Sequence, residues 1–155
     1  MNLFGLMDAS GSAMQAERLR AEVVAANMAN AETTRTESGG PYKRQHVVFA
    51  ANPTNQEFFS SLSKASQAAL QLTNDTEPPG GVHVAQVFED GAPPLKRYDP
   101  GHPDAGADGY VAYPDINPLT EMVDLMGATR AYGLNSSAVQ AEKGMITSAL
   151  DIARS

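Results

Sequence analysis

The sequence predicts a mainly α protein with a small β-rich middle. We expect the long N- and C-terminal helices to pair as an antiparallel coiled-coil stalk, with an irregular excursion of strands and loops between them. Two observations support this. Small and apolar residues recur at steps of three and four in both end segments, which places them on one helix face. All ten prolines lie between residues 41 and 118, and proline interrupts helices. The expected regions are 1–34, 35–116 and 117–155.

The first region contains a helix over residues 2–30 and an asparagine motif that follows it. Two glycines near its start cost roughly 1 kcal/mol each relative to alanine, so we expect residues 1–11 to fray in an isolated subunit. Its apolar stripe includes Leu6, Ala13, Leu19 and Val23.

Two asparagines, Asn27 and Asn30, lie three positions apart and therefore on one helical face. Asparagine is unfavourable inside a helix but favourable at its end, where its side chain bonds local backbone groups. The residues alone favour a helix C-cap and exit turn.

The middle region, 35–116, has strand patterns at 42–49, 82–88 and 110–113. Residues 92–98 are extended, and their two prolines exclude a central position in a sheet. We expect Lys43 and Arg44 to lie on an exposed strand face.

An insert at about 51–78 interrupts this region. Apolar residues at helical spacing predict a short helix over about 55–72, flanked by polar linkers. After residue 98 comes a long turn, held rigid by its prolines.

The final helix is expected over 117–153. Asn117 suits the capping position, Pro118 suits the first turn, and Glu121 and Asp124 favour the positive end of the helix dipole. About 37 residues at ~1.5 Å each make a rod of roughly 55 Å. A rod of this length needs a partner helix and other chains to cover it.

This helix carries two neighbouring stripes of small and apolar residues. We expect one stripe to pair with residues 6–26 of the same chain and the other to face neighbouring subunits. Three glycines either allow close packing there or delay ordering of the helix until assembly. The first stripe includes Ala131, Leu134, Ala138, Ala141, Met145, Ser148 and Ile152, and the second includes Met122, Leu125, Tyr132, Val139 and Ile146.

Composition excludes several classes of protein. The net charge of -7 argues against a nucleic-acid surface, which needs clustered Lys and Arg. There is no cysteine, and hence neither a disulfide nor a thiolate metal site. No window approaches ~18 apolar residues, so we expect no membrane insertion. The N-terminus lacks the basic segment of a cleaved signal peptide.

One acid–histidine cluster stands out in the long turn, where His102 lies between Asp99 and Asp104. A small hydrolase using this histidine would need a pocket that a thin middle region hardly encloses. A surface turn, in which aspartates bond their own backbone, is the favoured interpretation. No phosphate-binding glycine loop or nucleophile elbow is present. We therefore expect no catalytic, cofactor-binding or metal-binding residues, no cofactor and no enzyme activity.

Six short motifs, spread over the chain outside about 51–78, carry a family resemblance. With them the chain resembles the bacterial flagellar basal-body rod protein family, and within it the proximal rod proteins. Glu32 departs from the smaller residue usual at its position, and the insert is longer than expected. The motifs are Ala26–Thr33, Gly39–Tyr42 before a basic strand, Tyr98–Ala105, Gly109–Asn117, Glu121–Asp124 and Ala128–Tyr132.

The resemblance implies a structural subunit of the proximal rod, the drive shaft of the flagellum. Its partners would be copies of itself and other rod subunits in a helical assembly, together with the flagellar type III export apparatus. Its location would be the periplasmic rod, reached from the cytoplasm without cleavage of a signal peptide. A heterologous contact that does not close into a ring generates such a helical assembly.

We therefore expect the assembly interface to include the seam residues of both helices and the two asparagines. A helical-hairpin adaptor or export chaperone is the alternative, since it would keep the seams but need no strand-rich middle. The expected interface residues are Leu6, Ala13, Leu19, Val23, Asn27, Asn30, Met122, Leu125, Tyr132, Val139 and Ile146.

Overall fold

The computed structural model describes residues 3–52 and 80–154, with side chains from Gly5 onward. It confirms two long terminal helices separated by a small strand region. The expected helix at about 55–72 lies outside the described residues. The elements are α1 (Leu3–Ala29), β1 (Gln45–Ala51), β2 (Val82–Glu89), β3 (Leu95–Tyr98), β4 (Tyr110–Tyr113) and α3 (Pro118–Arg154).

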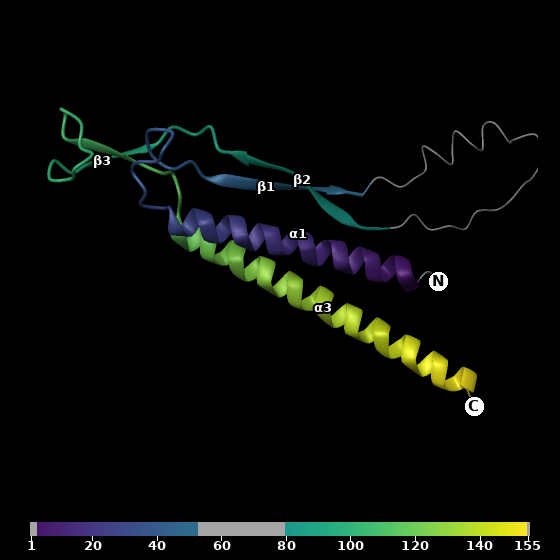
Figure 1. Cartoon of the computed structure of the whole chain (residues 1–155). Coiled ribbons are helices and arrows are strands. Elements are labelled where there is room, and N and C mark those ends of the chain that lie inside the picture. The colour runs from purple at the N-terminus through teal and green to yellow at the C-terminus, as the bar shows by residue number, and fades with distance from the viewer. Residues whose placement is uncertain (1–2, 53–79, 155) are drawn as a thin grey trace, which may run out of the picture.

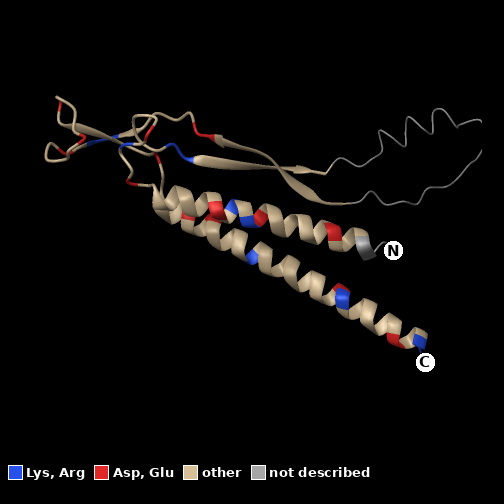
Figure 2. Cartoon of the chain, viewed as in Figure 1, with Lys and Arg blue, Asp and Glu red and all other residues tan. Residues whose placement is uncertain are grey.

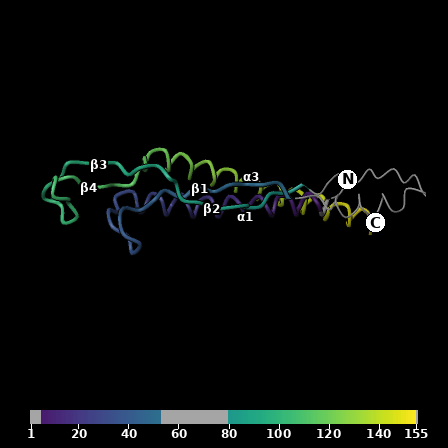
Figure 3. Tube along the Cα trace, turned by 90° about the horizontal axis from the view of Figure 1, so that it is seen from above, coloured from purple at the N-terminus to yellow at the C-terminus, as the bar shows by residue number. Residues whose placement is uncertain are grey.

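The described part of the chain is elongated (Figures 1 and 3), and Figure 1 shows α1 between the β1–β2 hairpin and α3. The β1–β2 hairpin lies along one side of α1, and α3 runs back along the other side in the opposite direction. The β3–β4 pair lies beyond the end where α1 finishes and α3 begins (Figure 1). Since α1 has 27 residues and α3 has 37, α3 offers more surface than α1 covers.

The β1–β2 hairpin is a two-stranded antiparallel ribbon with a register shift between Val48 and Phe49. A ribbon of two strands is marginally stable alone, and here α1 supports it. The backbone N–H of Val82 donates to Ser12 Oγ of α1 at 3.1 Å. Gly81 has φ +154°, and a Cβ there would lie 2.7 Å from Asn52 Nδ2. The same Cβ would lie 3.2 Å from Ser12 Oγ of α1, so glycine suits both the backbone conformation and the close approach to α1.

The second ribbon pairs β3 with β4, from Leu95 opposite Tyr113 to Tyr98 opposite Tyr110. All four residues of β3 are exposed, whereas Val111 of β4 is 1% exposed. The ring of Tyr113 receives the Arg97 guanidinium at 3.9 Å from its centroid. This small cluster holds the segment that leads into α3.

The start of α3 is as the sequence predicts. The N–H of Leu119 donates to Asn117 Oδ1 at 2.9 Å, and Pro118 is the first helical residue. This is the N-cap arrangement, in which a side chain satisfies a helix N–H that has no backbone partner.

The seam between α1 and α3 is polar or small at its most buried positions. On α3 the buried residues are Glu121, Ala128 and Glu142, spaced in multiples of seven, and half-buried Asn135 fits the same spacing. This seam runs between the two predicted stripes. Leu125, Val139 and Ile146 flank it and are half-buried.

Candidate assembly surface and the junction that orients it

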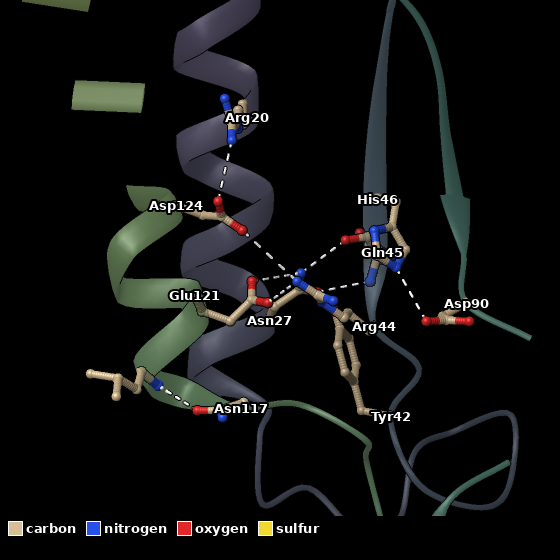
Figure 4. Close-up of polar contacts among 11 residues, drawn as sticks. Arg20, Asn27, Tyr42, Arg44, Gln45, His46, Asp90, Asn117, Glu121 and Asp124 are labelled. Carbon is tan, nitrogen blue, oxygen red and sulfur yellow. Dashed lines mark hydrogen bonds and ion pairs between the residues drawn. The ribbon is translucent and has the colours of Figure 1, made fainter. Parts of the chain in front are cut away.

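Asn27 is the hub of a junction between α1, the β1–β2 hairpin and α3 (Figure 4). Its side chain is 1% exposed. Its amide Nδ2 donates to the carbonyl of Gln45 at 2.8 Å and to Glu121 Oε2 at 3.1 Å. Its Oδ1 accepts the Gln45 N–H at 2.9 Å and the Tyr42 hydroxyl at 3.1 Å. An amide offers two donors and two lone pairs, so every hydrogen-bonding capacity of Asn27 is used.

The Tyr42 phenol is held in the donor form that this arrangement needs. Burial raises its pKa, and the negative charges of Glu121 and Glu89 raise it further. The hydroxyl therefore keeps its proton at neutral pH and donates to Asn27.

Two acids at the start of α3 face one basic residue from α1 and one that immediately precedes β1 (Figure 4). Glu121, 1% exposed, forms an ion pair with the Arg44 guanidinium. Asp124 Oδ1 lies 3.3 Å from Arg20 Nη2 of α1, and its Oδ2 lies 3.9 Å from Arg44 Nη2. A buried carboxylate is costly unless it is paired and hydrogen-bonded, and here Arg44 and Asn27 supply both.

The expectation of an exposed strand face at residues 43 and 44 is wrong for Arg44. β1 begins only at Gln45, and the side chain of Arg44 is 27% exposed against 63% for Lys43. The buried carboxylate of Glu121 accounts for the difference, since it attracts the guanidinium toward the helices. Nothing in the local pattern of the sequence distinguishes the two basic residues.

Asn30 has different partners from Asn27. Its Nδ2 donates to the Ala26 carbonyl at 2.9 Å, and its Oδ1 accepts the Thr33 hydroxyl at 3.1 Å. These contacts close the end of α1 and the following turn, as the capping interpretation predicts.

The acid–histidine cluster forms a turn that docks beside the end of α1. Asp104 accepts the Thr34 hydroxyl at 2.8 Å and lies 3.7 Å from Arg35, while its own N–H donates to His102 Nδ1. Its acid is thus engaged in structural contacts. Among residues 3–52 and 80–154, no group of three or more His, Asp or Glu is placed to hold a metal ion.

A second acid–histidine pair closes the open end of the hairpin. His46 Nε2 lies 3.2 Å from Asp90 Oδ2. The backbone N–H of Ala92 donates to the other Asp90 oxygen at 2.9 Å. The hydrogen bond from the Ala92 N–H is the main cause that lowers the pKa of the Asp90 carboxyl, and the hydrogen bond with His46 is the second.

Two family models match the chain on its helices. The model described as "Flagella basal body rod protein" matches residues 7–35, and "Flagellar basal body rod FlgEFG protein C-terminal" matches residues 107–152. Both matched segments include partners of the junction, with Asn27 in the first and Glu121 in the second.

Full-length relatives extend this likeness over the whole chain. The flagellar basal-body rod protein FlgC of Borreliella burgdorferi is 38% identical over 98% of each chain. The protein of the same name from Bacillus subtilis is 38% identical over 99% of this chain and 100% of its own. That of Escherichia coli is 36% identical over 98% of each chain. The chain belongs to the FlgC family of flagellar basal-body rod proteins.

The interface residues expected for this FlgC-family chain occupy three kinds of position. Val23 and Asn27 are buried within the chain at 8% and 1% exposure. Three are exposed, namely Leu6 at 51%, Met122 at 49% and Tyr132 at 41%. The half-buried remainder are Ala13, Leu19, Asn30, Leu125, Val139 and Ile146.

α3 of this FlgC relative exposes large apolar residues along its whole length, on the surface that α1 leaves uncovered. Figure 2 shows that the charged residues of α3 are few and widely spaced along the helix. Soluble proteins rarely expose contiguous apolar patches of this kind except where they bind partners. The two stripes predicted from the sequence did not include Leu119, Val123 and Met126, although these three residues follow helical spacing. The exposed large apolar residues of α3 are Leu119, Met122, Val123, Met126, Tyr132, Leu134, Met145, Leu150 and Ile152, at 41–77% exposure.

Proposed function

We propose that this chain is a structural subunit of the proximal rod of the flagellar basal body, assembling helically with copies of itself and with other rod subunits. The exposed apolar face of α3 carries the proposal. One side of α3 lies on α1, and nine large apolar residues of α3 remain exposed. Burying this face against a neighbour removes apolar surface from water at about 25 cal/mol per Å².

The layer order suits an open assembly. The hairpin lies on one side of α1 and α3 on the other, so the two outer surfaces of a subunit differ. Contacts between unlike surfaces are heterologous, and they produce a helix whenever the rotation does not close. A drive shaft that is many subunits long requires such a non-closing contact.

In this proposal α1 and α3 form an antiparallel coiled coil. The seven-residue spacing of Glu121, Ala128 and Glu142 supports this, because a heptad spacing keeps a seam facing its partner helix. Regions 1–34 and 117–155 then form the stalk of the subunit, and region 35–116 forms the part of the subunit outside the stalk. The half-buried residues Leu125, Val139 and Ile146 strengthen the stalk, while exposed Leu6, Met122 and Tyr132 serve subunit contacts.

The proposal places the subunit in the periplasmic rod, exported through the flagellar type III apparatus without cleavage of a signal peptide. It assigns no catalytic role and no nucleic-acid contact. No helix within the described residues is long and apolar enough to cross a bilayer.

A comparison of charges on the two sides of α3 tests this function. Met126→Asp, on the outward face, should abolish motility and rod assembly while circular dichroism of the purified subunit stays unchanged. Val139→Asp, on the α1 side, should lose several kcal/mol of folding stability through burial of an unpaired charge. Deleting residues 2–12 or 140–155 should also abolish motility, and His102→Ala should be harmless.

Three results would contradict the rod assignment. Normal motility with Met126→Asp would show that the outward face is not a contact. Loss of function by His102→Ala with normal assembly would favour chemistry at the turn instead. Absence of the chain from purified basal bodies, with retention in the cytoplasm, would favour the adaptor or chaperone.

The isolated subunit should be partly disordered at its ends and should fold there on assembly. The polar seam and the exposed face both leave the ends of α1 and α3 short of apolar contacts. Near-complete helix that melts cooperatively at low protein concentration would argue against this expectation.

A further inference from the structure

The pairing of α3 with α1 rests on little apolar burial. The buried apolar residues of α1 are Ala16, Val23 and Val24, and on α3 only Ala128 is both buried and apolar among the described residues. The other two buried residues of α3 are glutamates. Beyond the half-buried apolar residues that flank the seam, the helices therefore depend on polar contacts to stay together, and these gather at the end where α3 begins.

The cation that compensates Glu121 comes from neither helix. Arg44 precedes β1, and its guanidinium reaches both Glu121 and Asp124, one turn apart on α3 (Figure 4). Its position depends on the hairpin, because the backbone of the next residue, Gln45, is fixed by two hydrogen bonds to the side-chain amide of Asn27. Arg44 thus faces α3 only when the hairpin is docked on α1.

We propose that Arg44 makes the pairing of α3 with α1 conditional on docking of the β1–β2 hairpin. With the hairpin displaced, Glu121 would be left buried without its cation, and an uncompensated buried carboxylate strongly disfavours the closed arrangement. Asn27 holds the hairpin, and Arg44 then holds α3. This inference concerns the fold of the subunit and does not depend on its place in the rod.

The absence of cysteine makes the proposal directly measurable, because label sites can be introduced into the full chain without background. Exposed Ala25 and Thr129 report the α1–α3 distance, and exposed Ala25 and Gln86 report the α1–hairpin distance. Spin labels on Ala25→Cys/Thr129→Cys and on Ala25→Cys/Gln86→Cys give two distance distributions by pulsed electron paramagnetic resonance.

Each variant has its own expected result. In the parent chain both distributions are narrow. Arg44→Met broadens the α1–α3 distribution and leaves the α1–hairpin distribution narrow, since the Asn27 contacts to Gln45 persist. Adding Glu121→Gln to Arg44→Met restores the narrow α1–α3 distribution, because the buried charge is gone. Asn27→Ala broadens both distributions.

Lys43→Met is the matched control. It removes the adjacent cation, whose ammonium is exposed and paired with Glu89 at 3.6 Å, and both distributions should remain narrow. A control that broadens the α1–α3 distances as much as Arg44→Met would overturn the specific role of Arg44.

Three other results would also overturn the proposal. They are a broad α1–α3 distribution in the parent chain, an unchanged distribution in Arg44→Met, and failure of the double variant to recover. If Arg44→Met unfolds the chain completely, as seen by circular dichroism, recovery in the double variant supports the proposal. Unfolding of both variants refutes it, because the buried charge would then not be the cause.

Discussion

The three glycines of α3 provide a prediction in which stability and assembly move in opposite directions. Gly127, Gly133 and Gly144 are exposed, and a Cβ built at any of them meets nothing within 4 Å. None has a positive φ, so alanine fits the helix without strain. In a helix interior glycine is about 1 kcal/mol less favourable than alanine. Each Gly→Ala change should therefore stabilise the isolated subunit by up to about 1 kcal/mol.

No contact within the described chain needs these glycines, and we expect them to allow close contact with a neighbouring subunit. An added methyl group would hold a neighbouring helix away from the α3 backbone. The triple Gly→Ala variant should raise the midpoint of urea unfolding, followed by circular dichroism at low concentration, and reduce motility and the yield of rods. Gly91→Ala is the control, because Gly91 is an exposed loop glycine with nothing near its Cβ. It should leave both measurements unchanged.

Two outcomes would refute this reasoning in different ways. A lower unfolding midpoint would mean that the glycines serve the subunit itself. A higher midpoint with full motility would mean that they only keep the helix weak before assembly and touch no neighbour.

Three further predictions concern single positions in the described chain. Asn27→Ala should cost roughly 2–4 kcal/mol in urea unfolding, because it leaves several buried polar groups without partners, while Asn30→Ala should cost about 1 kcal/mol; equal losses would contradict the hub role. Gly109→Ala should cost about 1–3 kcal/mol by the same assay, because Gly109 has φ +75° and a Cβ would lie 2.8 Å from a tyrosine ring, and an unchanged midpoint would be inconsistent with this geometry. The pKa of Asp90 lies below its usual range, chiefly because its carboxylate accepts a backbone N–H. The ionised Asp90 carboxylate therefore contributes to folding stability above the pKa of the unfolded state, and this contribution is lost as the pH falls through the lower pKa of the folded state. Titration of the Asp90 carboxyl followed by NMR should give a midpoint below that of a free aspartate. Asp90→Asn should remove this pH dependence from the folding stability.

The sequence predicted the outline of the fold because helix and strand signals are local. The cap at Asn117, the first-turn Pro118 and the β4 strand at Tyr110–Tyr113 agree with the structure. The strand predicted at 42–49 starts three residues later, at Gln45, because Tyr42 and Arg44 contact the helices instead of extending the ribbon.

The seam and the junction could not be predicted in the same way. Apolar periodicity locates faces by their hydrophobic residues, but the most buried residues of α3 are Glu121, Ala128 and Glu142. The role of Arg44 depends on contacts with residues 77 and 80 positions away, as its partners Glu121 and Asp124 show. No pattern within a window of ten or twenty residues contains that information.

Glu142, at the far end of the seam, has a role in choosing which face of α3 pairs with α1. Glu142 is 2% exposed, and its Oε2 has no hydrogen-bond partner in the described chain. Replacing a buried charge by an apolar residue of similar volume is often stabilising, by about 1–4 kcal/mol. A polar residue at such a position can instead specify which faces pair. If the seam were apolar, the outward face of α3 could compete with it for α1.

We therefore expect Glu142→Leu to raise the folding stability of the isolated subunit by roughly 1–4 kcal/mol and to lower the specificity of pairing. Light scattering after size exclusion should then show non-native dimers and larger species, whereas Gln140→Leu, at an exposed position two residues away, adds similar apolar surface without changing the seam. A Glu142→Leu variant that is more stable, remains monomeric and assembles normally would show that the buried acid does not select the faces. Loss of stability would show that Glu142 is compensated in solution by a group that the described residues do not supply.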